Sequence, residues 1–139
     1  MCSVTHVAAG AVIGVLVDSR LGAFLIGFVS HIPLDAVPHI DFKDYRIDAA
    51  LTVGLLVGIF AFTGLSPILF GAAGAVVPDV ENLLWKTGII EERHKVFPTH
   101  SGLIKHGQAR VGPGPAGAIL MSAFSICVVA LVLVLGGSK

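Results

Sequence analysis

Five apolar stretches alternate with polar segments along the 139-residue chain. They run from Val7 to Val17, Leu21 to Val37, Ala49 to Leu65, Ser66 to Trp85 and Pro115 to Leu135. An α-helix rises about 1.5 Å per residue and a bilayer's hydrocarbon core is about 30 Å thick, so about twenty apolar residues are needed to cross it. The last stretch has this length and no charged residue, and it predicts a transmembrane helix. The first is too short to cross unaided and predicts a half-span, a tilted helix or one arm of a helical hairpin.

The composition indicates which solvent such a chain requires. Hydrophobic residues make up 55% of the chain, charged residues make up 13%, and the mean hydropathy is +0.90. A soluble domain carries about 25% charged residues because polar groups must cover its surface. A lipid bilayer can solvate apolar surface instead, so we expect a single integral membrane domain over residues 1–139. Its expected fold is an all-α polytopic bundle of four to five apolar helices with one polar, His-rich loop. The net charge of zero does not indicate a nucleic-acid partner.

Small residues, prolines and a threonine predict where helices approach closely, bend, end or begin. The segments from Gly54 to Gly58 and from Gly71 to Gly74 have the small-residue spacing that allows two helices to approach closely. Pro33 and Pro38 are expected to kink or end the second helix, and Thr5 is a candidate N-cap for the first.

The alternation of helices gathers the polar residues on one side of the membrane. If stretches two to five each cross, the charged loop at 38–48 and the polar segment at 86–113 share a side, because two spans separate them. If the first stretch pairs with the second as a hairpin, His6 returns to that side as well. The residues that this topology places near one membrane face are His6, His31, Asp35, His39, Asp41, Asp79, Glu81, His94, His100 and His106.

The distribution of basic residues predicts the orientation of that face. Seven of the nine Lys and Arg residues fall on it, and Arg20 and Lys139 fall opposite. Basic residues favour the cytoplasmic side, so the polar face is expected to be cytoplasmic. Eight of the nine acids lie there too, but acids contribute little to this rule.

The pair His31 and Asp35 is the sharpest candidate for chemistry. The two residues are four apart, so a helix would project both from one face, one turn from each other. That geometry suits two metal ligands, or a ligand with its carboxylate partner; a hydrogen-bonded interhelical pair is the alternative. A carboxylate near the end of a membrane span is costly without a partner, which favours a functional role.

Two further segments add donors of the same kind. Asp79 and Glu81 end the fourth apolar stretch, and His94, His100 and His106 lie in the polar segment that follows. Imidazole binds zinc, manganese or iron readily, and added carboxylates favour a hard or borderline divalent ion. Each residue alone could be an ordinary interfacial polar group. Together they predict a divalent metal site, with zinc as the first expectation and manganese or iron as alternatives.

Four short motifs also carry a resemblance to a known family. They are Thr5-His6 before a Gly/Ala-rich helix, Pro78-Asp79-Val80-Glu81 at a helix end, His94 through Thr99-His100-Ser101, and His31 to Asp35. At these motifs the chain resembles the membrane-bound, predicted metal-dependent hydrolases, which include a LexA-regulated inner-membrane protein. The resemblance extends from His6 to about His106. It implies a metal-dependent hydrolase that is distantly similar to zinc-dependent phospholipases C.

The chain departs from the family's pattern at several positions, including Asn82 in place of a frequent histidine. Five residues separate His94 from His100 where the family has four, and Glu81 replaces the second aspartate of the Pro-Asp-x-Asp motif. The His31-x-x-x-Asp35 motif precedes the Pro-Asp motif, whereas it follows in typical members. These differences indicate a divergent or rearranged branch, or a related family without the activity.

Two classes of function follow from these observations. The first is a metal-dependent hydrolase that acts on a phosphoester or a lipid at the membrane surface. The second is a non-catalytic metal-binding scaffold, a partner subunit, or a small transporter that would require an oligomer. For the hydrolase, the expected ligands are His6, His31, Asp35, Asp79, His94 and His100, and Glu81 or His106 is expected to act as the base or to orient a ligand.

Overall fold

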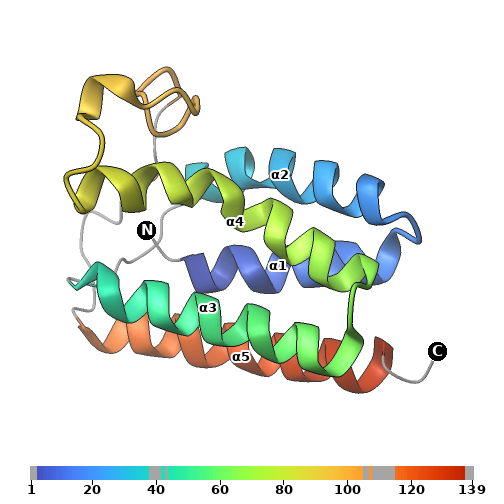
Figure 1. Ribbon diagram of the computed structural model, residues 1–139. Helices are drawn as coiled ribbons and strands as arrows, with labels where there is room; N and C mark the ends of the chain where they lie inside the picture. The colour runs from blue at the N-terminus through green and yellow to red at the C-terminus, as the bar shows by residue number, and fades with distance from the viewer. Residues whose placement is uncertain (1–2, 38–41, 43, 105–106, 108–114, 137–139) are drawn as a thin grey trace.

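The computed structural model describes residues 3–37, 42, 44–104, 107 and 115–136. The described residues form an all-helical bundle without strands (Figure 1). This confirms the all-α fold class. The elements are α1 (Ser3–Leu16), α2 (Arg20–Ala36), α3 (Tyr45–Thr63), α4 (Pro67–Lys86), a 3₁₀ turn η1 (Glu92–His94) and α5 (Pro115–Gly136).

Side-chain caps set the start of three of these helices. Ser19 begins α2 by accepting a hydrogen bond from the backbone N–H of Gly22 at 3.2 Å, and Asp44 begins α3 by accepting from Arg46 at 2.9 Å. Ser66 accepts from the N–H of Leu69 at 3.3 Å and begins α4. These side chains satisfy backbone donors that have no partner within their own helix.

Two expected helix boundaries are wrong. Thr5 is not an N-cap, because α1 already begins at Ser3 and Thr5 lies inside it. The charged segment before the third span is not all loop, because α3 begins at Tyr45 and includes Asp48 in its first turn. Pro33 lies inside α2 and does not end it, whereas Pro38 lies outside the described residues.

Helix α4 packs across α1 and α2, with its backbone in direct contact with theirs (Figure 1). A Cβ added to Gly71 would collide with the backbone carbonyl of Gly10, and a Cβ added to Gly74 would collide with that of Phe24. The expected close approach at Gly71 to Gly74 is therefore confirmed. By contrast, nothing lies within 4 Å of a Cβ built at Gly54 or Gly58, so this pair makes no close helix contact within the described part of the chain.

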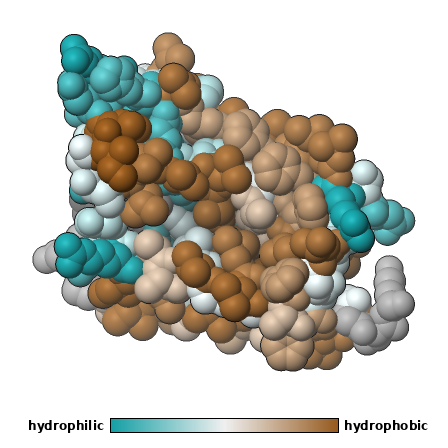
Figure 2. Space-filling view, in the orientation of Figure 1, coloured by the Kyte–Doolittle hydropathy of each residue, from teal (hydrophilic) through white to brown (hydrophobic). Residues whose placement is uncertain are grey.

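Among the described residues, three helices are long and apolar enough to cross a membrane: α3, α4 and residues Ala116–Gly136 of α5. Helix α1 is apolar but shorter. Large apolar side chains stand exposed around the bundle; Leu16 is 77% exposed, Phe62 79% and Leu120 73%. Figure 2 shows apolar side chains over the middle of the visible face and polar side chains toward its two ends. This surface is consistent with membrane association.

Candidate metal centre

Three helices and one loop bring five ionisable side chains together at one end of the bundle. His31 and Asp35 lie one turn apart near the end of α2. His6 comes from the start of α1, Asp79 from the second half of α4, and His100 from the loop after α4. The four helical residues are at most 3% exposed, and the side chain of His100 is 1% exposed.

The carboxylate of Asp35 lies at the centre of this cluster. Its Oδ1 is 3.3 Å from Nε2 of His6, and its Oδ2 is 3.2 Å from Nε2 of His31. Nε2 of His100 lies 3.3 Å from the same Oδ2, which also accepts a 2.6 Å hydrogen bond from the hydroxyl of Thr99. Three imidazole nitrogens and a carboxylate therefore face one point.

Two overlapping sets of donors lie close enough together that they could hold a metal ion. The donor atoms of His6, His31 and Asp79 lie within 4.8 Å of one another, as do those of His31, Asp35 and His100. Oδ1 of Asp79 is 3.7 Å from Nε2 of His31 and 3.8 Å from Nε2 of His100. Zinc binds nitrogen and oxygen at about 2.0–2.2 Å, so ligand atoms in a tetrahedral site are roughly 3.4 Å apart. These buried groups could hold a divalent metal ion.

The backbone of α4 fixes the orientation of the His31 ring. Nδ1 of His31 lies 2.7 Å from the carbonyl oxygen of Ala75. A carbonyl oxygen can only accept, so Nδ1 carries a proton and donates it, which leaves Nε2 directed at the cluster as the ring nitrogen that could bind an ion. Metal-binding histidines are commonly oriented by such a bond from the other ring nitrogen.

Glu81 positions the loop and does not belong to either donor set. Its carboxylate accepts hydrogen bonds from the backbone N–H of Val96 and, at 3.1 Å, from that of Phe97. Its Oε2 also lies 3.3 Å from Nδ1 of His100. The sequence left open whether Glu81 acts as a base or orients a ligand, and these contacts favour orientation.

Phe97 and Thr99 complete the cluster and were not anticipated as part of it. The ring of Phe97 is 8% exposed and packs edge-on against His31, with ring centroids 5.2 Å apart. Thr99 is 4% exposed and donates to Asp35 as described above. Their positions in the sequence could not have identified them, because side chains in a loop have no fixed period that shows which of them face inward.

One of the expected metal ligands, His94, lies outside the cluster. His94 is exposed in η1 and belongs to neither donor set among the described residues. It lies on the outer side of the loop, whereas His100 lies on the inner side. His106, like His39 and Asp41, lies outside the described residues.

Lys95 attaches the outer part of the loop to the end of α4. Its Nζ lies 3.4 Å from the ring centroid of Trp85, and the residue is 9% exposed. Burial lowers the pKa of Lys95, although the charges of Glu92 and Glu81 oppose this shift. The contact is a cation–π pair that helps to hold the loop over the cluster.

No family model, no curated protein and no solved structure matches this chain. The resemblance to metal-dependent hydrolases therefore remains a prediction based on short motifs.

Proposed function

We propose that this protein is an integral-membrane, metal-dependent hydrolase whose metal is bound by His31, Asp35 and His100, with His6 and Asp79 as further ligands. The observation that carries the proposal is the convergence of these donors from three helices and a loop, all buried, at one end of an apolar bundle. Burying so many ionisable groups is costly unless an ion or a close partner compensates them.

The donor set favours zinc, with manganese or iron as alternatives. Imidazole nitrogen mixed with carboxylate oxygen suits borderline divalent ions better than calcium or magnesium, which prefer oxygen alone. When bound in such a site, a divalent ion lowers the pKa of a coordinated water to about 7 and polarises a phosphoryl or acyl oxygen.

The chain's own residues would keep the donors ready for this chemistry. The bond from His31 to the carbonyl of Ala75 keeps Nε2 directed at the centre, and Glu81 holds the loop that supplies His100. Phe97 and Thr99 shield the centre from bulk water.

The substrate class that fits this position is a phosphoester or a lipid at the membrane surface. The cluster lies at one end of the bundle, beside helices that are long and apolar enough to span a bilayer. Lys86, Arg93 and Lys95 lie at this end of the bundle, whereas Arg20 lies at the opposite end, at the start of α2. Because basic residues favour the cytoplasmic side, we propose that the end with the cluster faces the cytoplasm.

A non-catalytic metal-binding scaffold is the second candidate. The observation that favours it is the near-complete burial of every donor in the cluster, because structural metal sites are closed and catalytic ones keep a position open. The scaffold binds the same metal but turns over no substrate.

Elemental analysis and a turnover assay on the same detergent-purified protein separate the two candidates. The wild type and His94→Ala should carry zinc, and the double variant His31→Ala/Asp35→Ala should not. Hydrolysis of phospholipid in mixed micelles by the wild type and by His94→Ala, but not by the double variant, supports the hydrolase. Metal without hydrolysis supports the scaffold, and a metal-free wild type contradicts both.

A further inference from the structure

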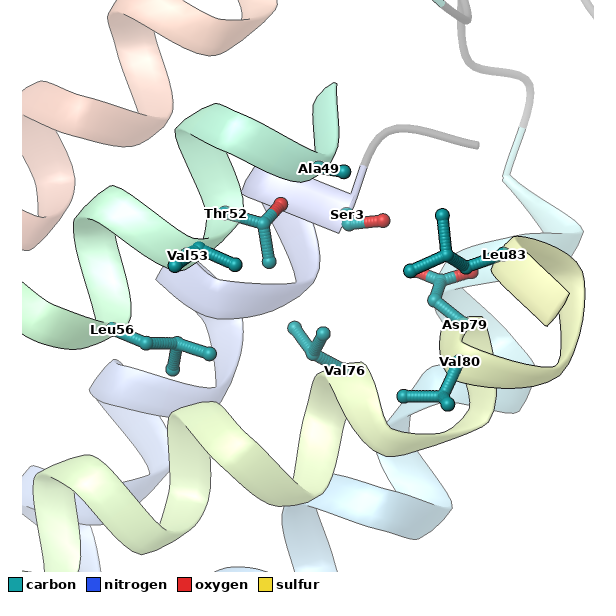
Figure 3. A pocket seen from close by; sticks show the side chains of 9 residues that line it. All are labelled: Ser3, Ala49, Thr52, Val53, Leu56, Val76, Asp79, Val80 and Leu83. Carbon is teal, nitrogen blue, oxygen red and sulfur yellow. The ribbon is translucent and has the colours of Figure 1, made fainter. Parts of the chain in front are cut away.

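An apolar pocket of about 170 Å³ lies between α3 and α4, beside the start of α1 (Figure 3). Ser3, Thr52 and Asp79 contribute to its lining, but the surface that faces the pocket is apolar. The walls are formed by side chains of α3 and α4, namely Ala49, Val53, Leu56, Val76, Val80 and Leu83.

The pocket opens to the outside of the bundle between these two helices. Val53 of α3 is 60% exposed and Val80 of α4 is 47% exposed, so both lie on its outer rim, whereas Ser3 is 1% exposed and lies on its inner side. Both α3 and α4 are long and apolar enough to cross a membrane. The rim therefore continues the apolar surface that the bundle presents to lipid.

The long axis of the pocket follows the two helices. Helix α3 begins, and α4 ends, at the end of the bundle that holds the candidate metal centre (Figure 1). Ala49 and Leu83 therefore lie nearer to that end, and Leu56 and Val76 lie deeper in the bundle. The lining covers about two turns of each helix, or roughly 10 Å. Lipid acyl chains in a bilayer run in the same direction.

The size and chemistry of the pocket fit part of one acyl chain. An apolar cavity of about 150 Å³ holds a molecule of the size of benzene, so this pocket has room for roughly six carbon atoms. Water is disfavoured there because apolar walls offer it no hydrogen-bond partners. An empty pocket would lose the dispersion contacts of its walls. Within a bilayer, lipid tails are the apolar molecules that can supply these contacts.

Asp79 connects the pocket to the metal centre. It belongs to the pocket lining, and its Oδ1 lies 3.7 Å from Nε2 of His31 and 3.8 Å from Nε2 of His100. Leu83, which lies one turn beyond Asp79 on α4, marks the end of the pocket that is closer to the bundle end. A lipid whose tail lies along the pocket would thus have its polar part on the side of the metal centre.

We propose that the pocket between α3 and α4 binds one acyl chain of a membrane lipid and directs the polar end of that lipid to the metal centre. The assignment of this lipid as substrate rests on the proposed function, which it narrows from phosphoesters in general to a lipid that enters sideways from the bilayer. Binding of the chain itself requires neither metal nor turnover.

Photo-cross-linking in zinc-loaded proteoliposomes tests the pocket. The probe is a phosphatidylcholine with a diazirine in one acyl chain, diluted into unlabelled phosphatidylcholine. Mass spectrometry of the wild type should find adducts on Leu56 and Val76, which are only partly exposed, as well as on Phe124 of α5, which is 70% exposed. The adducts on Phe124 report lipid at the outer surface and serve as the internal control.

Ala49→Phe fills the pocket, because a phenyl ring has the size of the ligand that such a cavity takes. The adducts on Leu56 and Val76 should be lost in this variant, and those on Phe124 should remain. Ala50→Phe is the matched control: Ala50 is exposed, adjacent and absent from the lining, so its variant should keep all the adducts.

A second matched pair lies on α4 and decides the matter if Ala49→Phe does not fold. Val80→Phe adds a ring at the rim and should reduce the pocket adducts, whereas Val77→Phe adds one at an exposed position outside the lining and should not. A wild type labelled on Phe124 but on neither Leu56 nor Val76 would overturn the proposal. Pocket adducts that persist in both filled variants would do the same.

Hydrolysis of long-chain phosphatidylcholine by the same proteoliposomes separates this inference from the proposed function. We expect kcat/KM to be lower in Ala49→Phe than in Ala50→Phe by about tenfold or more. Pocket adducts without any hydrolysis would support the acyl-chain pocket and contradict the hydrolase. Hydrolysis without pocket adducts would contradict the pocket alone.

Discussion

The two sides of α4 differ in how tightly they are packed, and the candidate chemistry follows that difference. Toward α1 and α2, glycines bring the backbones into contact, and at the end of that interface three imidazole nitrogens lie 3.2–3.3 Å from the Asp35 carboxylate. Toward α3, an apolar pocket of about 170 Å³ lies between the helices, and Thr52 has a buried hydroxyl without a hydrogen-bond partner among the described residues. Close backbone packing thus positions ligands relative to one another, and looser packing leaves space for a ligand or water.

We call the side of α4 that faces α1 and α2 the closed side, and the side that faces α3 the open side. The closed side should be the more sensitive to an added side-chain volume. Gly71→Val places its Cβ against the backbone of Gly10, where neither helix can move away without separating the ligands on α1, α2 and α4. We expect a destabilisation of about 1–3 kcal/mol or more and loss of bound metal. Thermal unfolding in detergent and elemental analysis measure both.

Gly58→Ala is the control on the open side. No atom lies within 4 Å of the added Cβ, and alanine is a better helix former than glycine. This variant should melt at or above the wild-type temperature. Equal destabilisation by Gly71→Val and Gly58→Ala would contradict the contrast between the two sides.

Two histidines of one loop provide a test within the closed side. His100→Ala removes a buried donor that faces Asp35, whereas His94→Ala removes an exposed ring. We expect zinc affinity to fall by at least about 100-fold for the first and to stay unchanged for the second. Competition with a chromophoric chelator gives the zinc dissociation constants of both variants. Similar losses of zinc affinity in the two variants would show that the loop binds metal in another arrangement.

Glu81→Gln should have a smaller effect, because Glu81 acts through the loop. The amide keeps one acceptor for the backbone of Val96 or Phe97 but loses the charge beside Nδ1 of His100. Zinc affinity should fall by about 10-fold. A hydrolase in which Glu81 served as the base would instead bind zinc normally and lose turnover, so affinity and kcat must be measured together.

Thr52→Val should have the smallest effect on stability. The hydroxyl is buried and has no hydrogen-bond partner among the described residues, so its removal leaves no described donor or acceptor behind. We expect the free energy of unfolding to change by no more than about 0.5 kcal/mol. A large loss of stability in thermal unfolding would show that the hydroxyl has a structural partner.

Helix positions were predictable because each apolar stretch is long and its polar boundaries are sharp. The pairing of His31 with Asp35 was predictable for a similar reason, since the period of a helix determines which residues share a face. The meeting of His6, Asp79 and His100 with that pair followed from the alternation of helix directions. Each of these inferences uses geometry that does not depend on tertiary detail.

Asp48 and His94 show where such reasoning fails. Asp48 lies in a charged segment that resembles a loop, yet the cap at Asp44 draws it into α3. Its spacing with Thr52 and Ile59, which share a buried helical face, was the signal that could have identified it. For His94 and His100 no such signal exists, because the loop turns through contacts with Glu81 that no local pattern encodes.

X-ray absorption at the zinc edge of the purified, zinc-loaded wild-type protein tests the central claim most directly. We expect nitrogen and oxygen ligands at about 2.0–2.2 Å, with the multiple scattering of several imidazole rings. This imidazole signal should decrease in His100→Ala and not in His94→Ala. Sulfur ligands, an oxygen-only shell, or a spectrum unchanged by His100→Ala would contradict it.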